Sequence, residues 1–327
     1  DINILNNKLE LDLNKNDYNL NTGIQSYERI GTRKSDRYQF VLPYYNFDKI
    51  VSDNIFNGLI SFKSSGNNSL NNTNTLESNI SNDIYYNSKD FISNLGIKKN
   101  LNVYFKNFNS IGQNSSKYKS SPQVEIISLY NFKLSYPLFK EEKNRTSYLT
   151  PKLSLTFNPS DMKDHSSSST KMNVGNIFNI NRLGLNDSFE SGKSLTLGMD
   201  FKKEFEIDDI NKYFEFKLAT ALRDKEENFI PSTSTLNKKN SNLFGSIETD
   251  FFKNINFDYN FSIDNDLSTF EYNNFNTTIS INNLVTTFGF IEENGEMGDA
   301  NIFLNTLGYK IDDKNYITFK TRRNRKI

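Results

Sequence analysis

The sequence predicts an all-β protein built as an antiparallel transmembrane β-barrel, with about fifteen strands in its 327 residues. Three observations lead to this fold class. Many segments alternate strictly between apolar and polar residues, and helical spacing is almost absent. Only 35% of the residues are apolar, yet 14% are aromatic. No window approaches the roughly 18 consecutive apolar residues of a membrane-spanning helix.

The composition argues against two simpler classes of protein. An apolar share of 35% lies below the ~45–50% of a soluble globular domain, which leaves little material for a conventional core. Disordered chains are poor in aromatic residues, whereas this chain has 28 Phe and 17 Tyr. A barrel in lipid reconciles the two observations, because only every second residue of each strand must be apolar.

The predicted strands place apolar residues at every second position, opposite polar or charged ones. In chain order, the clearest cover residues 123–136, 149–157, 195–202, 214–218, 255–264 and 317–322. In the first of them, Ile127 and Leu129 stand on the polar side. Short connections are predicted at 208–212, 253–254 and 312–315, and longer polar ones at 158–171 and 224–240. Strands with one strongly polar face fit a water-filled lumen better than the interior of a soluble β-sandwich.

A β-solenoid is the competing architecture, since it also has many strands and Asn-rich turns. A solenoid shows a fixed internal period, and the sequence has no constant repeat. No break in composition marks a linker, so residues 1–327 are expected to belong to a single barrel domain.

Residues suited to catalysis or metal binding are scarce, with one His and no Cys. His165 follows Asp164 in a serine run typical of a flexible loop, which would not hold a nucleophile and a base in register. The pair Asp264 and Asp266 begins like a calcium-binding loop but lacks the glycine and glutamate that such a loop requires further on. Four carboxylate pairs are predicted in turns or loops: Asp208 and Asp209, Glu226 and Glu227, Glu292 and Glu293, and Asp312 and Asp313. We therefore expect no catalytic residue, cofactor or metal, and a protein that is not an enzyme.

The formal net charge is zero, from 39 basic and 39 acidic residues, so no global field attracts nucleic acid. The basic cluster Arg322, Arg323, Arg325 and Lys326 continues an alternating segment. We interpret it as a strand with basic residues entering a lumen, and expect no nucleic-acid partner.

Four short runs between Ser35 and Gly245 share a further feature. They contain Ser35, Asp36, Arg37, Tyr38 and Pro43; Thr150, Pro151 and Lys152; Asn181, Arg182, Asp187, Glu190 and Gly192; and Pro231, Leu236, Lys239, Ser241 and Gly245. In this order the runs resemble the C-terminal barrel region of the LptD family, the lipopolysaccharide-assembly outer-membrane proteins. Two departures occur near the fourth run. Asn242 stands where the family usually has aspartate, and Ala221, Leu222 and Arg223 stand where a Gly-Gln pair is expected.

The resemblance implies an integral outer-membrane β-barrel of Gram-negative bacteria that inserts lipopolysaccharide into the outer leaflet. Sugars would cross the lumen, while acyl chains would leave sideways through the seam between the first and last strands. The implied partners are lipopolysaccharide, an LptE-like plug lipoprotein, periplasmic bridge proteins that reach an N-terminal jelly roll, and outer-membrane lipid.

The resemblance also implies that about fifteen strands are only part of a larger barrel. The signal peptide, the jelly roll and the terminal gate strands are expected to be missing from this sequence. Seven charged residues on the polar sides of predicted strands are candidate lumen-lining residues that face sugar or plug: Lys152, Asp200, Lys202, Glu215, Lys217, Glu248 and Asp250.

Two other functions remain open from the sequence. A porin-like outer-membrane channel would be a self-contained barrel with a constriction of opposed charges and an aromatic final residue, whereas this chain ends in Ile327. A secreted β-solenoid adhesin would show a constant repeat period and no lipid-facing aromatic bands.

Overall fold

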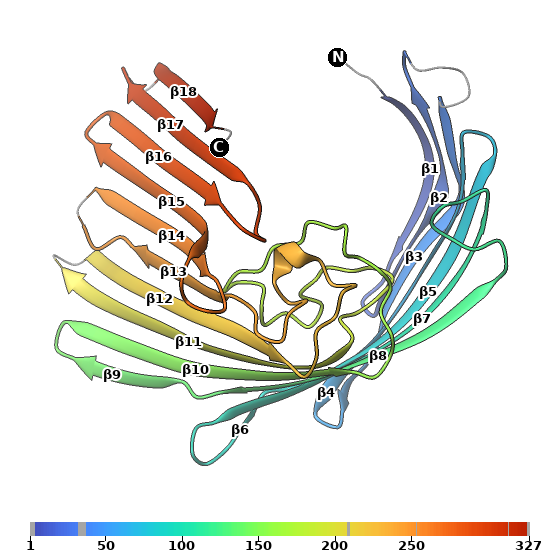
Figure 1. The fold of residues 1–327 in the computed structure, drawn as a ribbon, viewed down its shortest axis with the longest axis horizontal. Helices are drawn as coiled ribbons and strands as arrows, with labels where there is room; N and C mark the ends of the chain where they lie inside the picture. The colour runs from blue at the N-terminus through green and yellow to red at the C-terminus, as the bar shows by residue number, and fades with distance from the viewer. Residues whose placement is uncertain (1–3, 32–36, 208–209, 253, 313, 326–327) are drawn as a thin grey trace. The chain divides into compact units, whose positions relative to one another are not determined.

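The computed structural model of the chain, drawn in Figure 1, describes residues 4–31, 37–207, 210–252, 254–312 and 314–325. These residues form eighteen β-strands, where the sequence predicts about fifteen, and a short 3₁₀ helix, η2 (Ser232–Ser234). The all-β prediction is confirmed. The strands are β1 (Ile4–Asn14), β2 (Tyr18–Arg29), β3 (Tyr38–Ile55), β4 (Gly58–Asn71), β5 (Thr75–Ser88), β6 (Phe91–Ile92), β7 (Lys98–Gln113), β8 (Gln123–Ser135), β9 (Leu138–Glu142), β10 (Arg145–Asn158), β11 (Gly192–Ile207), β12 (Ile210–Arg223), β13 (Leu243–Thr249), β14 (Ile255–Ile263), β15 (Phe270–Ile281), β16 (Leu284–Glu293), β17 (Ala300–Lys310) and β18 (Tyr316–Arg325).

The strands belong to one antiparallel sheet, in which most strands pair with their neighbours along the chain. Two pairings pass over a short strand: β5 pairs with β7 across β6, and β8 pairs with β10 across β9. Antiparallel pairing differs from the parallel β-helix of many solenoids. Within the described ranges β1 pairs with β2 and β18 with β17, so the sheet is not closed.

The predicted alternating segments coincide with parts of β8, β10, β11, β12, β14 and β18, and only Tyr136 and Asp264 fall one residue beyond their strands. Several strands extend beyond the predicted bounds, since residues that interrupt the alternation still pair. Lys203 pairs with Phe214, for example, in the β11–β12 ladder. In β8 the two residues on the wrong side of the pattern are buried, with Ile127 3% and Leu129 1% exposed. Short strands such as β6 and β9 leave too few residues to show a period.

The chain divides into two compact units. Unit 1 comprises residues 1–90, 100–130 and 158–161, and unit 2 comprises residues 91–99, 131–157 and 162–327. Each unit is held by long-range strand pairing.

The strands of unit 1 separate polar and apolar side chains onto two faces. A cross-strand row on the polar face contains Glu10, Gly23, Tyr44, Asn67 and Asn79. The neighbouring row, on the apolar face, contains Leu11, Thr22, Tyr45, Gly66 and Ile80. Leu11 and Ile80 are 54% and 45% exposed, so the described residues leave these two side chains of the apolar face largely uncovered.

Unit 2 repeats this division over more strands. One row on its polar face contains Asp200, Lys217, Ser246, Asn260 and Asn274. The adjacent apolar row contains Phe201, Phe216, Ile247, Tyr259, Phe275, Phe290 and Phe303. Phe290 and Phe303 contact each other with ring centroids 4.9 Å apart. The apolar row is therefore a band that runs from β11 to β17 and is aromatic on every strand except β13, where Ile247 stands.

The hydrophobic core of unit 2 lies outside the strand ladder, between the sheet and its connections. Figure 1 shows the connection 159–191, the connection 224–242 and η2 gathered on one side of β11–β13. We call the buried apolar cluster there the connection core; it contains Met162, Met172, Ile177, Leu183, Leu185, Ala219, Ala221, Ile230, Leu236, Phe244 and Met297. The first connection is longer than the predicted 158–171, because its second half folds into this core.

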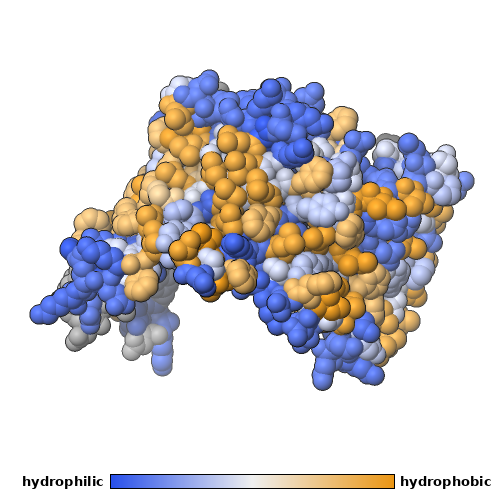
Figure 2. All heavy atoms as spheres, turned by 90° about the horizontal axis from the view of Figure 1, so that it is seen from below, coloured by the Kyte–Doolittle hydropathy of each residue, from blue (hydrophilic) through white to orange (hydrophobic). Residues whose placement is uncertain are grey.

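Large apolar side chains are exposed in both units, and Figure 2 shows orange patches of them gathered on the face it views. Within the described ranges no helix has the length and apolar character needed to cross a membrane.

Candidate functional site

The seven residues predicted to line a lumen all lie in unit 2, on or beside neighbouring strands. They are Lys152 on β10, Asp200 and Lys202 on β11, Glu215 and Lys217 on β12, Glu248 on β13, and Asp250 just beyond β13. We call this set the charged wall.

The register of the sheet pairs opposite charges across β11 and β12. Asp200 lies opposite Lys217, and Lys202 lies opposite Glu215. Such pairs favour the observed register, each by roughly 0.2–1 kcal/mol. Glu248 lies opposite Glu215 instead, and its carboxylate accepts a hydrogen bond from the hydroxyl of Tyr213.

The side chains of the charged wall form ion pairs and still remain partly exposed to water. Lys152 pairs with Asp200, and Lys217 Nζ lies 2.6 Å from Glu215 Oε2. These four side chains keep between 21% and 32% of their surface exposed. Partly exposed pairs of this kind contribute about 0–1 kcal/mol, so the charged wall offers accessible charge more than stability.

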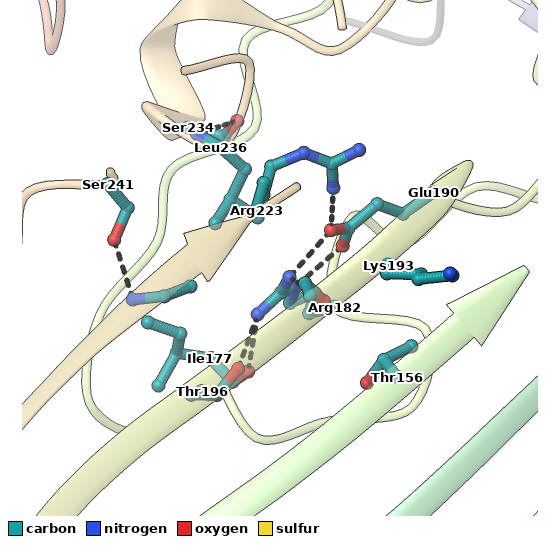
Figure 3. Close-up of polar contacts among 12 residues, drawn as sticks. Thr156, Ile177, Arg182, Glu190, Lys193, Thr196, Arg223, Ser234, Leu236 and Ser241 are labelled. Carbon is teal, nitrogen blue, oxygen red and sulfur yellow. Dashed lines mark hydrogen bonds and ion pairs between the residues drawn. The ribbon is translucent and has the colours of Figure 1, made fainter. Parts of the chain in front are cut away.

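A buried ion-pair network lies beside the connection core and is drawn in Figure 3. Arg182 and Glu190 come from the connection 159–191, and Arg223 ends β12. Arg182 donates from Nε to Glu190 Oε2 and from Nη2 to Glu190 Oε1, both at 2.6 Å. Arg223 donates from Nη1 to the same carboxylate. Because the three residues are between 7% and 8% exposed, little water screens these contacts.

The remaining donors of Arg182 bond to nearby oxygens. Its guanidinium reaches Thr196 Oγ1 at 2.9 Å, Ser194 Oγ at 3.0 Å and the carbonyl of Ile177 at 3.4 Å. Burial alone would raise the pKa of Glu190. The guanidinium of Arg182, and then that of Arg223, outweighs this effect and holds the pKa of Glu190 below its ordinary value. The network therefore fastens the connection 159–191 to β11 and β12 with a charged carboxylate.

The third and fourth of the four runs meet at this network and at the core beside it. Besides Arg182 and Glu190, Asn181 bonds through Nδ2 to the carbonyl of Leu185 at 2.7 Å. Pro231 precedes η2, and its carbonyl accepts from the hydroxyl of Ser234 at 2.6 Å. Of the other members of these two runs, Asp187 lies near Lys163 and His165, Gly192 opens β11 at φ +80°, and Leu236 is in the connection core. The carbonyl of Lys239 accepts from the backbone N–H of Arg223 at 2.7 Å, Ser241 Oγ accepts from the backbone N–H of Ala221 at 2.9 Å, and Gly245 is in β13.

The first two runs lie mainly on strands. Ser35 and Asp36 fall outside the described residues. Arg37 pairs with Glu28, while Tyr38 and Pro43 are in β3. Thr150, Pro151 and Lys152 are in β10.

Sequence reasoning missed Arg223 as a member of the network. The sequence marks this position only as a difference from the family, which has a Gly-Gln pair where Ala221, Leu222 and Arg223 stand in this chain. The register that carries Arg223 to Glu190 depends on the whole β11–β12 ladder, in which Arg223 pairs with Ser194.

The serine run around His165 is folded onto unit 2. His165 donates its backbone N–H to the carbonyl of Phe229 at 2.9 Å, and its Nε2 lies 3.1 Å from Asp187 Oδ1. The hydroxyl of Ser166 bonds to Asp164, and that of Ser168 bonds to the carbonyl of His165. No serine hydroxyl in the described part of this run bonds to the imidazole, so the geometry of a Ser-His-Asp triad is not present there.

Of the carboxylate pairs that the structure describes in full, one lies in a different place from the prediction, while Asp208, Asp209 and Asp313 fall outside the described residues. Glu292 and Glu293 end β16 instead of forming a turn. Glu292 Oε2 accepts from Asn273 Nδ2 at 3.0 Å, and Glu293 Oε1 pairs with Lys171 Nζ at 2.5 Å. Both residues belong to the ladder, since β16 pairs with β15 and with β17 at these positions. Within the described ranges, no three His, Asp or Glu side chains are arranged to hold a metal ion.

Comparison with protein-family models and with curated proteins finds no match to this chain.

Proposed function

We propose that this chain is part of the wall of an outer-membrane β-barrel that transports lipopolysaccharide and inserts it into the outer leaflet. The observation that carries the proposal is the meeting of the third and fourth runs. Arg223 joins the two runs, because its Nη1 donates to Glu190 of the third run and its backbone N–H donates to the carbonyl of Lys239 of the fourth run at 2.7 Å. Leu236 of the fourth run also packs in the connection core with Leu183, which follows Arg182 in the third run.

The separation of polar and apolar faces supports a membrane wall. Lipopolysaccharide has a polar saccharide and apolar acyl chains, so its carrier needs a wet surface and a lipid-facing one. The charged wall and the aromatic row of unit 2 lie on opposite faces of the same strands. A bilayer favours this arrangement because its interior accepts apolar side chains while a water-filled lumen accepts charged ones.

The apolar face of unit 1 supports the same placement. It has an apolar groove of about 330 Å³ whose lining includes Tyr45, Ile80 and Val124. Polar side chains also occur on this face, and they form hydrogen bonds with one another. Ser64 Oγ lies 3.0 Å from the Tyr45 hydroxyl and donates to Asn82 at 2.7 Å. Polar groups that bond to one another are tolerated better at a lipid surface than free ones.

The proposed partners are those implied by the resemblance: lipopolysaccharide, outer-membrane lipid, a plug lipoprotein, and periplasmic bridge proteins that act through an N-terminal domain. The proposed location is the outer membrane of a Gram-negative cell. The chemistry of transport requires no cofactor, since no bond is made or broken.

Depletion of the full-length protein tests the proposal. We expect lipopolysaccharide at the cell surface to fall and to recover when the wild-type gene is restored. Glu190→Ala should restore it poorly, because two buried guanidinium groups lose their carboxylate. Asp53→Asn removes an exposed acid on β3 and is the matched control. Unchanged surface lipopolysaccharide after depletion would rule out this function.

A porin-like channel is a second candidate, favoured by the alternating charges of the charged wall. Conductance across planar bilayers separates the two functions. A channel gives steady ion currents that change when Lys152 or Lys217 is neutralised, and its depletion leaves surface lipopolysaccharide unchanged.

A further inference from the structure

The polar face of unit 1 contains an open cavity of about 410 Å³, formed by strands β1 to β5. Its polar side chains belong to Lys8, Glu10, Asn21, Gln25, Tyr44, Asn46, Ser65, Asn67 and Asn79. Five of these residues carry side-chain amides, and we call the site the amide cavity. Its volume lies within the ~300–1,000 Å³ typical of small-molecule sites, but most such sites are lined by apolar groups.

Strand register builds the amide cavity from residues far apart in the sequence. Asn21 lies opposite Asn46, which lies opposite Ser65. In the next row, Tyr44 lies opposite Asn67, which lies opposite Asn79. Because adjacent strands are ~4.8 Å apart, the amides form a regular polar lattice.

Gly23 gives Tyr44 room at one end of the lattice. A Cβ atom at Gly23 would lie 2.8 Å from the Tyr44 hydroxyl. With glycine there, the hydroxyl reaches across the strand and donates to Glu10 Oε2 at 2.5 Å.

Several hydrogen-bonding groups of the cavity have no protein partner in the described part of the chain. Asn79 Nδ2 donates to Asn67 Oδ1 at 2.9 Å, which leaves the Asn67 amide donors and the Asn79 carbonyl oxygen facing solvent. Neither Asn46 nor Ser65 has a side-chain hydrogen bond among these residues, and Asn46 is exposed. The cavity therefore offers donors and acceptors side by side.

The charge of the cavity is balanced. Lys8 and Glu10 are its charged residues, and they pair with each other. A surface with no net charge selects neither an anion nor a cation. Its free amides and hydroxyl suit a ligand whose groups both donate and accept hydrogen bonds, and the hydroxyls of an uncharged sugar do so.

We propose that the amide cavity is a binding site for uncharged saccharide, with Asn46, Ser65, Asn67 and Asn79 as its hydrogen-bonding residues. The assignment of the ligand's source rests on the proposed function: the saccharide is the sugar part of lipopolysaccharide, held against the wall apart from its phosphates and acyl chains. The paired charges of Lys8 and Glu10 border the site and are not used for recognition.

Binding to the purified full chain in detergent tests this inference. The probe is a neutral lipid-free oligosaccharide of the lipopolysaccharide, composed of uncharged hexoses without phosphate or carboxylate groups, and binding is measured by calorimetry. We expect the double substitution Asn46→Ala and Asn67→Ala to weaken binding about tenfold or more, since it removes two or more hydrogen bonds. Inorganic phosphate, tested alone, should not bind at this site.

Two control variants make the result specific. Asn256→Ala removes an exposed amide on the polar face of β14, outside the cavity, and should bind like the wild type. Lys8→Met combined with Glu10→Gln removes both charges and should also keep binding. Loss of binding in this charge variant together with full binding in the amide variant would overturn the proposal.

Matching circular dichroism spectra and thermal midpoints establish that each variant is folded. Asn46→Ser gives a milder second test of the same position.

Failure of this inference and failure of the proposed function give different results. If the oligosaccharide does not bind but depletion lowers surface lipopolysaccharide, the transport function stands and the amide cavity is not its saccharide site. If the oligosaccharide binds through the amides but depletion has no effect on surface lipopolysaccharide, the saccharide site stands and the transport function is wrong.

Discussion

At the scale of single residues, Glu190 bridges two buried guanidinium groups, those of Arg182 and Arg223. Glu190→Gln removes the charge and leaves both cations buried without a counter-ion. Removal of one partner from a buried ion pair costs about 3–5 kcal/mol, and we expect a loss of that size in the free energy of unfolding in detergent, measured with urea. The control Asp53→Asn should stay within about 0.5 kcal/mol of the wild type. Equal stability of Glu190→Gln and the wild type would show that the network does not hold the connection.

The same residue predicts a dependence of stability on pH. Its pKa in the folded state lies below the ordinary value of ~4.3, so its contribution is complete above that value and is lost as pH falls toward the folded pKa. The thermal midpoint of the wild type should therefore exceed that of Glu190→Gln at pH 7, and the difference should shrink as the pH falls below ~4.3. A difference that is independent of pH would mean that Glu190 does not act through its charge.

Residue-scale prediction from the sequence succeeds where the partners lie on the pattern that the sequence displays. Lys152 and Asp200 are both predicted on polar strand faces, and the structure pairs them. Arg223 could not be found in this way, since its partner Glu190 lies in a connection whose path no periodic pattern encodes. The amide cavity cannot be predicted from the sequence for a related reason: single Asn residues are common in this chain, and only strand register brings Asn46 and Asn67 together.

At the scale of elements, the two long connections carry the apolar packing that the strands lack. Leu236→Ala, in the connection 224–242, should cost about 2–5 kcal/mol, because Leu236 is fully buried and its removal leaves a cavity. The matched control is Leu197→Ala on the apolar face of β11, where the side chain is 38% exposed and its loss leaves no enclosed space. We expect less than about 1 kcal/mol there. Urea unfolding of both variants in the same detergent decides the comparison, and equal losses would contradict a core formed by the connections.

Strands can be predicted at this scale because the alternation of apolar and polar residues is visible within a few adjacent positions. The connection 159–191 was not, because Met162, Met172 and Ile177 show no common period and become a core only after the chain folds back on β12. The short strands β6 and β9 lacked enough residues for any pattern. The local sequence pattern thus specifies the paired strands of the sheet, while packing between distant segments specifies how the connections cover them.

At the scale of the whole molecule, the proposed membrane location makes opposite demands on neighbouring residues of one strand. Leu307 and Thr306 are adjacent on β17, with Leu307 opposite Phe319 and Thr306 opposite Lys320. Leu307 is 42% exposed, and in a bilayer it would face lipid. Thr306 shares the polar face and would meet water.

The pair Leu307→Arg and Thr306→Arg tests that location, since each variant adds the same charge to the same strand. In the outer membrane, Leu307→Arg should lower the free energy of folding into lipid by up to about 2–4 kcal/mol, the cost of arginine near the bilayer midplane, because the guanidinium enters hydrocarbon. Thr306→Arg should assemble like the wild type, since its charge faces a wet surface. Folding into lipid vesicles, followed by the heat-dependent shift of gel mobility, measures both variants. Comparable losses in the two, or none in either, would show that these faces do not divide lipid from water and would remove the basis for a membrane wall.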